Sequence, residues 1–322
     1  MAYDTDTRQA LLEAADAART APSVHNTQPW RWVIRPDALE LHAVTERQLT
    51  FQDPDGHMLL LSCGTALHHA QIALDAEGWQ YQIDRPAADP LAIIRPRRHA
   101  PIDPAAIRRY EQLQVRHTDR RTVSDIPIDA ATLDTLIAAT EQAGARLHPL
   151  PQDRVIELAV LVEHAQKTES SDHRLLAETA TWVGGDRTDA TGIPDANVPE
   201  ELPLTTVAER DFGAAGTLVT GAGHDAAATY AVLYGPGDDP TDWLRAGEAL
   251  NNLWLTATEH NISLLPLSSP TEVPYTRHQL ADMLGDIGFP YLVVRLGTLD
   301  PAHAGPHRTP RLPTEQVIEI HD

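Results

Sequence analysis

Cysteine is almost absent from this chain of 322 residues, in which Cys63 is the single example. One thiol excludes an intrachain disulfide and any metal site built on several cysteines. Cys63 lies between Leu61 and Ala66, in a stretch typical of a helix core. We therefore expect it to be buried and not to act as a nucleophile.

Positive charge is also scarce. Lys and Arg number 25 against 46 Asp and Glu, which gives a formal net charge of −21. A surface of this sign repels nucleic acid and anionic membranes, so neither is an expected partner. An anion-binding site in such a protein has to be built from a local group of arginines.

Long apolar runs and targeting segments are missing as well. No stretch approaches the roughly 20 apolar residues that a membrane-spanning helix requires. The N-terminal sequence Met1–Asp6 is polar and acidic, unlike a signal peptide. With 42% hydrophobic and 22% charged residues, the composition is that of a globular protein with a substantial core. We expect a cytoplasmic protein.

Several motifs for catalysis or cofactor binding are incomplete. The stretch 221–226 has the spacing of a dinucleotide fingerprint, but a strand-like sequence follows it where the fingerprint must open a helix. His303 and His307 are four residues apart but enclose Gly305 and Pro306, so they do not share a helix face and no metal site is expected. Neither a serine-hydrolase elbow nor a phosphate-binding P-loop occurs.

The hydrophobic pattern predicts an α+β fold with antiparallel-rich central sheets covered by helices. Helices are predicted near 7–20, 57–77, 103–115, 129–143, 153–167, 171–183 and 243–260, the last one capped by Asp242. Strands are predicted near 30–35, 39–43, 79–83, 91–95, 217–220, 227–234 and 290–297.

A long segment, 184–216, is rich in Gly, Pro, Asp and Thr and shows no regular pattern. An irregular stretch of this length is unusual inside a compact domain, which indicates a lid over a site, or else a disordered insertion. Its sizeable apolar anchors are Ile193, Val198, Leu202, Leu204, Val207 and Phe212.

Two stretches remain that can carry chemistry. The first, 21–30, joins a helix to a strand and offers backbone N–H groups and short polar side chains to a flat ligand, although its composition also suits an ordinary turn. The second brings Arg116, Arg120 and Arg121 together with Thr118, a set that suits a phosphate group or, alternatively, a solvated basic turn.

The order of these residues resembles the nitroreductase family of FMN-dependent oxidoreductases. Residues 22–30 are similar to the family's Pro-Ser-Ser-x-Asn-x-Gln-Pro-Trp loop, which touches the isoalloxazine ring from across the dimer interface. Residues 116–120 resemble its Arg-Ser-x-Arg motif for the FMN phosphate and ribityl chain, and 308–313 its closing basic segment. Residues 246–269 resemble its central helix and the loop that follows.

The motifs stand in an unusual order. In a family subunit the arginine motif precedes the ring loop, whereas here the loop at Pro22 precedes Arg116 by about 90 residues. The resemblance implies two degenerate units fused in one chain, as in the Acg group: a truncated half at 1–102 and a half at 103–322 that includes the lid-like segment 184–216. This nitroreductase-like fold of two pseudo-repeated halves would imitate the family's homodimer in a monomer, with further homodimerisation left open.

The resemblance implies one FMN site per chain. Its phosphate and ribityl side would consist of Arg116, Thr118, Arg120, Arg308 and Arg311. Near the ring it would place Pro22, Ser23, Asn26, Gln28, Leu267, Ser268 and Ser269. Val24, the pair Ser268-Ser269 and Thr309 depart from the family's usual serine, Glu-Gly and lysine.

The function implied is that of an FMN-dependent NAD(P)H oxidoreductase of nitroreductase type, with a nitroaromatic compound, a quinone or a related small molecule as electron acceptor. The flavin performs this chemistry, so no catalytic protein residue is required. One alternative is a protein that stores or sequesters FMN with little turnover. Another is a structural protein with a vacant ancestral site.

Overall fold

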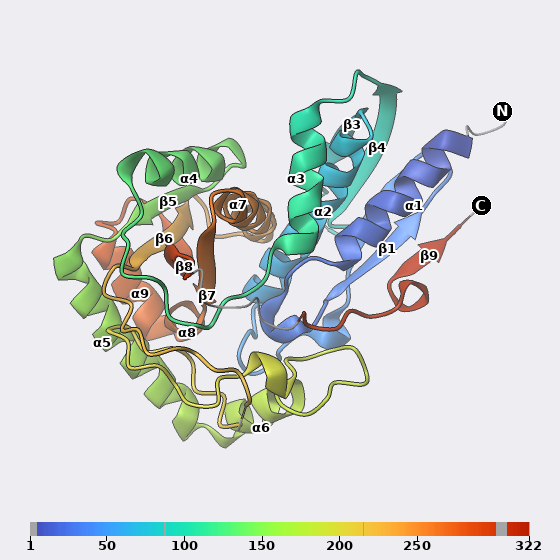
Figure 1. Ribbon diagram of the computed structural model, residues 1–322. Coiled ribbons are helices and arrows are strands. Elements are labelled where there is room, and N and C mark those ends of the chain that lie inside the picture. Colours follow the sequence, from blue (N-terminus) through green and yellow to red (C-terminus); the bar gives the residue numbers. More distant parts are fainter. Residues whose placement is uncertain (1–4, 87, 215, 301–307, 322) are drawn as a thin grey trace.

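The computed structural model describes residues 5–86, 88–214, 216–300 and 308–321 (Figure 1). They form an α+β fold with two separate sheets, as predicted. None of the helices described has both the length and the apolar character needed to cross a membrane.

The first sheet has the strand order β3-β4-β2-β1-β9. Its members are β1 (Trp30–Ile34), β2 (Leu39–Ala43), β3 (Trp79–Asp84), β4 (Ala92–His99) and β9 (Ile318–Ile320). All neighbours are antiparallel except β1 and β9, which run parallel. The last strand of the chain therefore completes the sheet that the first strands begin, and both ends of the chain lie on the same side of the molecule (Figure 1).

The second sheet has the order β5-β6-β8-β7 and is antiparallel throughout. Its members are β5 (Arg146–Pro149), β6 (Thr229–Gly235), β7 (Ile262–Leu267) and β8 (Phe289–Thr298). β8 is an inner strand, in agreement with the apolar run in the sequence.

Nine helices of four residues or more occur in the part of the chain described. They are α1 (Thr5–Arg19), α2 (His57–Ala76), α3 (Pro104–Val115), α4 (Ala130–Gln142), α5 (Gln152–Ser171), α6 (His173–Trp182), α7 (Pro240–Glu259), α8 (Ser269–Glu272) and α9 (Pro274–Met283). The side chains of Asp103 and Asp129 cap α3 and α4 by accepting a backbone N–H two or three residues ahead.

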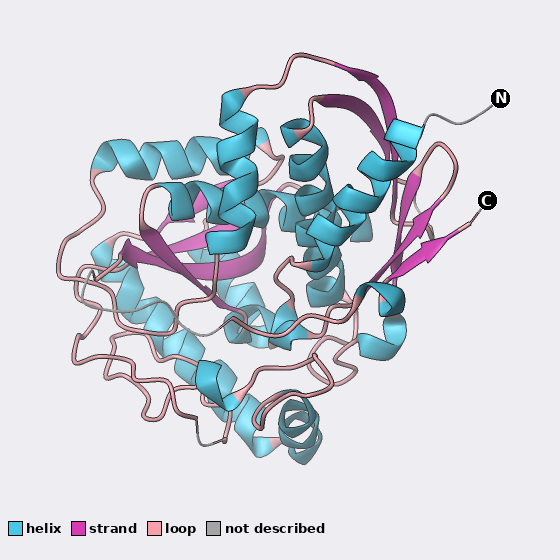
Figure 2. Ribbon diagram, turned by 45° about the vertical axis from the view of Figure 1, so that its right-hand side comes forward, coloured by secondary structure: helices cyan, strands magenta, loops and turns pink. Residues whose placement is uncertain are grey.

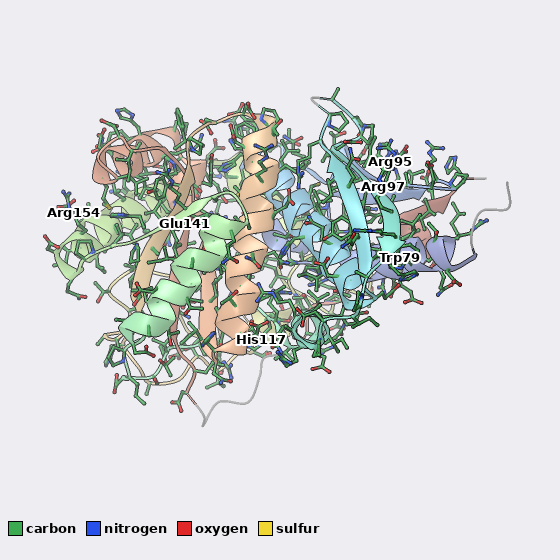
Figure 3. All side chains as sticks on the ribbon, turned by 90° about the horizontal axis from the view of Figure 1, so that it is seen from above. Trp79, Arg95, Arg97, His117, Glu141 and Arg154 are labelled. Carbon is green, nitrogen blue, oxygen red and sulfur yellow. The ribbon has the colours of Figure 1, made fainter. Side chains whose placement is uncertain are left out.

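α2 and α7 form the centre of the molecule. In Figure 3, α7 stands between α4, which carries Glu141, and the strands that carry Trp79, Arg95 and Arg97. Each helix has 20 residues with a glycine in the eighth position, Gly64 in α2 and Gly247 in α7. A Cβ atom at either glycine would lie 2.8 Å from the Cα atom of the other, so the two backbones touch where the helices cross.

The contacts at this crossing are reciprocal. A Cβ at Gly64 would lie 2.0 Å from the carbonyl oxygen of Leu244, and a Cβ at Gly247 would lie 2.0 Å from that of Leu61. Leu61 and Leu244 occupy the same position in the two helices, as Gly64 and Gly247 do. Such exchange of equivalent contacts is what a two-fold axis produces in a homodimer.

The sheets follow the same pseudo-symmetry. The strand orders β3-β4-β2-β1 and β7-β8-β6-β5 correspond strand by strand. β1 and β2 precede α2 and β3 and β4 follow it, just as β5 and β6 precede α7 and β7 and β8 follow it. Gly78 and Asn261, both with positive φ, end the two central helices in equivalent places. The halves differ in their insertions, because β1 and β2 are joined by a short turn whereas α5, α6 and a long irregular segment separate β5 from β6.

The sequence predictions need several corrections. Residues 217–220 form no strand and make only an isolated bridge through Leu218, so the irregular segment continues to β6. α7 begins three residues early, because Asp239 and Asp242 form a capping box. The elements β5, β7, α8 and α9 were not predicted, since β5 and β7 are short and gain their stability from pairing. His303 and His307 lie outside the described residues.

Candidate functional site

A cavity of about 260 Å³ is lined by residues from widely separated parts of the chain. The loop after α1, one side of α2 and the end of α3 with the segment after it form part of its wall. The rest comes from α5, the segment 184–216, α7, β7, α8, β8 and the C-terminal segment. Of the predicted site residues, those that line it are Pro22, Ser23, Asn26, Arg116, Thr118, Arg120, Leu267, Ser268, Ser269, Arg308 and Arg311.

Gln28 is the exception, since it does not line the cavity. Its side-chain nitrogen donates to the carbonyl oxygen of Ala190 at 2.8 Å, and its side-chain oxygen accepts from the backbone N–H of Leu312 at 2.9 Å. The amide of Gln28 therefore ties three segments together behind the cavity wall, and it is not free to contact a ligand.

Two arginines in the wall have no anionic partner among the described residues. Arg116 is buried with its guanidinium 4.6 Å from the ring centre of Trp254, and its Nε and Nη1 atoms have no hydrogen-bond partner among the described residues. Burial, together with the nearby charge of Arg311, lowers the pKa of Arg116 to about 9. Burial and the charge of Arg19 lower the pKa of Arg311 to about 10.

Arg311 is held in place by neutral oxygens. Its Nη1 donates to the side-chain oxygen of Asn26 at 3.0 Å, and its Nη2 to the carbonyl oxygen of Thr20 at 3.2 Å, whereas Nε has no partner in the described chain. A buried and a half-buried cation side by side, neither paired with a carboxylate of the described chain, are unfavourable unless an anion joins them. This end of the cavity is thus suited to a phosphate or a carboxylate.

The remaining basic residues differ in their roles. Arg120 donates to the carbonyl oxygen of Asn197 at 3.2 Å and lies 5.4 Å from the ring centre of Phe212. Arg308 extends from the C-terminal segment to Gln114 at the cavity rim. Arg121 does not line the cavity, because its guanidinium pairs with Asp119. The three arginines that the sequence places in one cluster therefore separate. Arg116 and Arg120 line the cavity, whereas Arg121 does not.

The loop at 22–28 adjoins Arg311, which donates to Asn26, and a set of local hydrogen bonds fixes the loop. Ser62 of α2 accepts the backbone N–H of Val24, and the hydroxyl of Ser23 accepts that of Gln28. The side chain of Asn26 donates to the carbonyl oxygens of Gly192 and Pro310. The side chain of Asn26 thus ties the loop to the segment 184–216 and to the C-terminal segment, while Ser23 and Asn26 line the cavity.

A buried network surrounds Arg210 beside this loop. Its guanidinium donates to Glu169 and Glu272, to the hydroxyl of Ser269 and to Nε2 of His25. Burial, reinforced by Glu272 and partly offset by Arg210, raises the pKa of Glu169 to about 7. Two carboxylates share one guanidinium, so the proton that Glu169 holds relieves their repulsion.

The segment 184–216 forms one wall of the cavity, largely as loop (Figure 2). Ile193, Asn197 and Phe212 are among the residues that line the cavity. Leu202 and Leu204 were expected to anchor the segment by burial, and this is wrong, because they are 44% and 82% exposed. The other expected anchors agree with the structure, since Ile193, Val198 and Val207 are buried and Phe212 is half-buried. Polar groups add to this hold, because Glu209 and Arg210 bind partners outside the segment.

Several residues at or near the cavity were not predicted from the sequence. His25, Trp254 and Arg210 line the cavity, and Arg295 in β8 binds Glu209 and Asp225 beneath it. A charged residue inside the apolar run of β8 was a detectable signal for Arg295. His25 and Arg210 gave no signal, because their role depends on distant neighbours.

No protein-family model matches the sequence. A Mycobacterium tuberculosis protein, provisionally named NAD(P)H nitroreductase Rv3131, is 34% identical over 98% of this chain and 92% of its own length. The M. tuberculosis protein provisionally named NAD(P)H nitroreductase acg is 28% identical over 98% of this chain and 96% of its own. Among solved structures, the FMN-dependent nitroreductase NfnB from Mycobacterium smegmatis in complex with NADPH covers 68% of this chain and 100% of its own, with 15% identity and a TM-score of 0.43.

Proposed function

The chain belongs to the NAD(P)H nitroreductase family, within its Acg-like group, and from that premise we propose that it is an FMN-dependent NAD(P)H oxidoreductase. Its acceptor would be a nitroaromatic compound, a quinone or a related small molecule. The observation that carries the proposal is the pair Arg116 and Arg311, the first buried and the second half-buried, which line one cavity and form no ion pair with a carboxylate of the described residues.

The cavity residues fit FMN in charge and polarity. Arg116 and Arg311 would hold the phosphate, with Arg120, Arg308 and the hydroxyl of Thr118 beside it. Pro22, Ser23 and Asn26 from one half, and Leu267, Ser268 and Ser269 from the other, would surround the ring. When bound, FMN supplies the hydride chemistry, and the protein contributes position and exclusion of water.

We also propose that the chain divides at 102/103 into two fused halves. The reciprocal contacts of Gly64 and Gly247 and the matching strand orders support this division. The strand β9 crosses back to the first sheet, so the tail is shared by both halves.

The test compares FMN with riboflavin, which lacks the phosphate. Arg116→Ala or Arg311→Ala removes a charge-assisted contact, so FMN affinity should fall by about ten- to hundredfold. Riboflavin affinity should change little. Arg154→Ala is a matched control, because this exposed arginine lies on α5 at the outer side of the molecule (Figure 3). Equal losses for both flavins would assign these arginines to the fold and not to a phosphate.

A second function, FMN storage with little turnover, is favoured by the many bonds that hold segment 184–216 against the cavity. Replacing this segment with a short Gly-Ser link and measuring NADPH oxidation with a nitroaromatic acceptor separates the two functions. A clear rise in rate means that the segment limits access to a competent site. Negligible activity with FMN still bound favours storage, and loss of FMN assigns the segment to the binding wall.

A further inference from the structure

The loop that carries His25 has an unusual backbone. His25, Asn26 and Gln28 all have positive φ angles, at 43°, 55° and 51°. Residues other than glycine avoid this region, and such strain collects at functional sites where the surroundings enforce it. Here Asn26 and Gln28 are fixed by bonds to Gly192, Ala190 and the C-terminal segment, which leaves His25 at the cavity wall.

Arg210 decides which nitrogen of His25 carries the proton. Its Nη1 atom lies 3.2 Å from Nε2 of His25. A guanidinium has only donors, so Nε2 has to accept. Arg210 cannot turn away easily, because Glu169, Glu272 and Ser269 hold its other nitrogen atoms.

The imidazole is neutral in this place. Burial lowers the pKa of His25 to about 3, and the charges of Arg210 and Arg120 act in the same direction, while Glu272 opposes them. A neutral ring that accepts at Nε2 has its proton on Nδ1. His25 is 7% exposed, and its Nδ1 atom has no partner within the described residues.

We propose that His25 donates its Nδ1–H to an oxygen of the ligand in this cavity, with Arg210 as the positioning residue that fixes the tautomer. The recognised group is an sp² oxygen, either a carbonyl of the flavin ring or an oxygen of the nitro or quinone acceptor. The inference rests on the proposed function and adds a binding residue to it. A buried N–H donor without a partner is rare, and a ligand oxygen supplies that partner.

The tautomer is testable without any ligand. Two-bond ¹H–¹⁵N correlation spectra of the labelled protein, with His25 assigned by comparison with a His25→Phe variant, should show an unprotonated Nε2 and no titration above pH 5. A signal of the Nε2–H tautomer, or titration near the usual histidine pKa, overturns the inference.

Two variants test the contact itself. His25→Phe keeps an aromatic ring against Phe212 but removes the donor, and His25→Asn restores an N–H near the position of Nδ1. The loss of one neutral hydrogen bond should weaken the affected step about three- to tenfold, with recovery in His25→Asn. His164→Phe, an exposed histidine on α5, is the matched control.

The pattern of losses identifies the oxygen. If it belongs to the flavin ring, His25→Phe weakens FMN and riboflavin equally. If it belongs to the acceptor, flavin affinity is unchanged and the KM for a quinone rises. Wild-type protein that binds FMN while His25→Phe alters neither affinity nor KM overturns the inference alone. Wild-type protein that binds no FMN overturns the proposed function, and the inference with it.

Discussion

The cavity has a counterpart on the other side of the pseudo-two-fold axis, and the two places are built differently. A shift of 183 residues, the separation of the hydrogen-bonded pair His68 and Asn251, relates α2 to α7. The cavity residues Thr65, Trp254 and Ser268 then correspond to Glu248, Gln71 and Arg85.

These three counterparts bind one another. Arg85 donates to both carboxylate oxygens of Glu248, at 2.9 and 2.7 Å, and Gln71 donates to the same group at 2.7 Å. At the cavity, two hydroxyls and an indole surround a space. At the equivalent positions on the other side, an ion pair fills that place. The comparison teaches that one fold can hold both a site and its filled copy, with the difference made by a few side chains.

The largest effect is expected when the ion pair of Glu248 and Arg85 is introduced at the equivalent positions of the cavity. The wild-type protein should hold one FMN per chain, because Arg85 and Glu248 fill the counterpart, which has no pair like Arg116 and Arg311 among the described residues. The double variant Thr65→Glu/Ser268→Arg places the same ion pair across the cavity, and flavin binding should be lost entirely. Flavin absorbance per chain after saturation and gel filtration measures both values.

The converse change provides the control. Glu248→Thr/Arg85→Ser opens the counterpart without adding arginines, so the flavin count should stay at one. Two flavins in the wild-type chain, or one in the Thr65→Glu/Ser268→Arg protein, would contradict the comparison.

The second test concerns what the two sides share. Gly64→Ala and Gly247→Ala each drive a methyl group into the backbone of the facing helix, so each should lower the free energy of unfolding by about 3 kcal/mol or more. Because the contacts are reciprocal, the two losses should be similar. Urea unfolding monitored by circular dichroism measures them, with Arg245→Ala, exposed on the same helix α7, as the control. A loss at one glycine alone would argue against the pseudo-symmetry.

The third test measures how much the ion pair of Glu248 and Arg85 contributes to the free energy of unfolding. Glu248→Ala leaves Arg85 and Gln71 without their acceptor and should cost about 1–3 kcal/mol in unfolding free energy. The double variant Arg85→Met/Glu248→Met removes both charges and should recover much of that loss. At the cavity, Thr65→Ala removes a hydroxyl that donates to Pro22 and Ser62, with an expected cost of about 1 kcal/mol. If Glu248→Ala costs no more than Thr65→Ala, the ion pair does not stabilise the closed side.

The fourth test concerns a pH dependence that originates at the cavity. The folded-state pKa of Glu169, about 7, is above its ordinary value of 4.5. The stability that this group contributes is therefore present below about pH 4.5 and is lost as pH rises through 7. Glu169→Gln keeps an acceptor for Arg210 without the charge.

Between pH 4.5 and 8 the unfolding free energy of the wild type should fall. In Glu169→Gln this fall should be smaller by about 1–2 kcal/mol. Parallel urea titrations at these pH values measure the difference. Glu163→Gln, which changes an exposed carboxylate on the same helix α5, should behave like the wild type. Identical pH profiles for all three proteins would show that Glu169 and Glu272 do not compete for Arg210.

Local sequence signals were reliable wherever a short range of residues decides the structure. The helices that start after Asp103 and Asp129, the central helices α2 and α7, and the strands β1 and β2 were predicted from patterns that act over a few residues. The edge strand β5, with four residues, was missed because its stability comes from β6, some 80 residues later.

By itself, the sequence determined most of the helices and strands, the family and many of the residues that gather at the cavity, because motif order and periodicity are properties of the chain. Tertiary structure alone decided that Arg116 faces the cavity while Arg121 turns to Asp119, that Gln28 is used up by Ala190 and Leu312, and that Arg210 sets the tautomer of His25. It also decided that Glu248 and Arg85 fill the second site. These choices depend on burial and on partners from distant segments, and both are fixed only when the halves pack together.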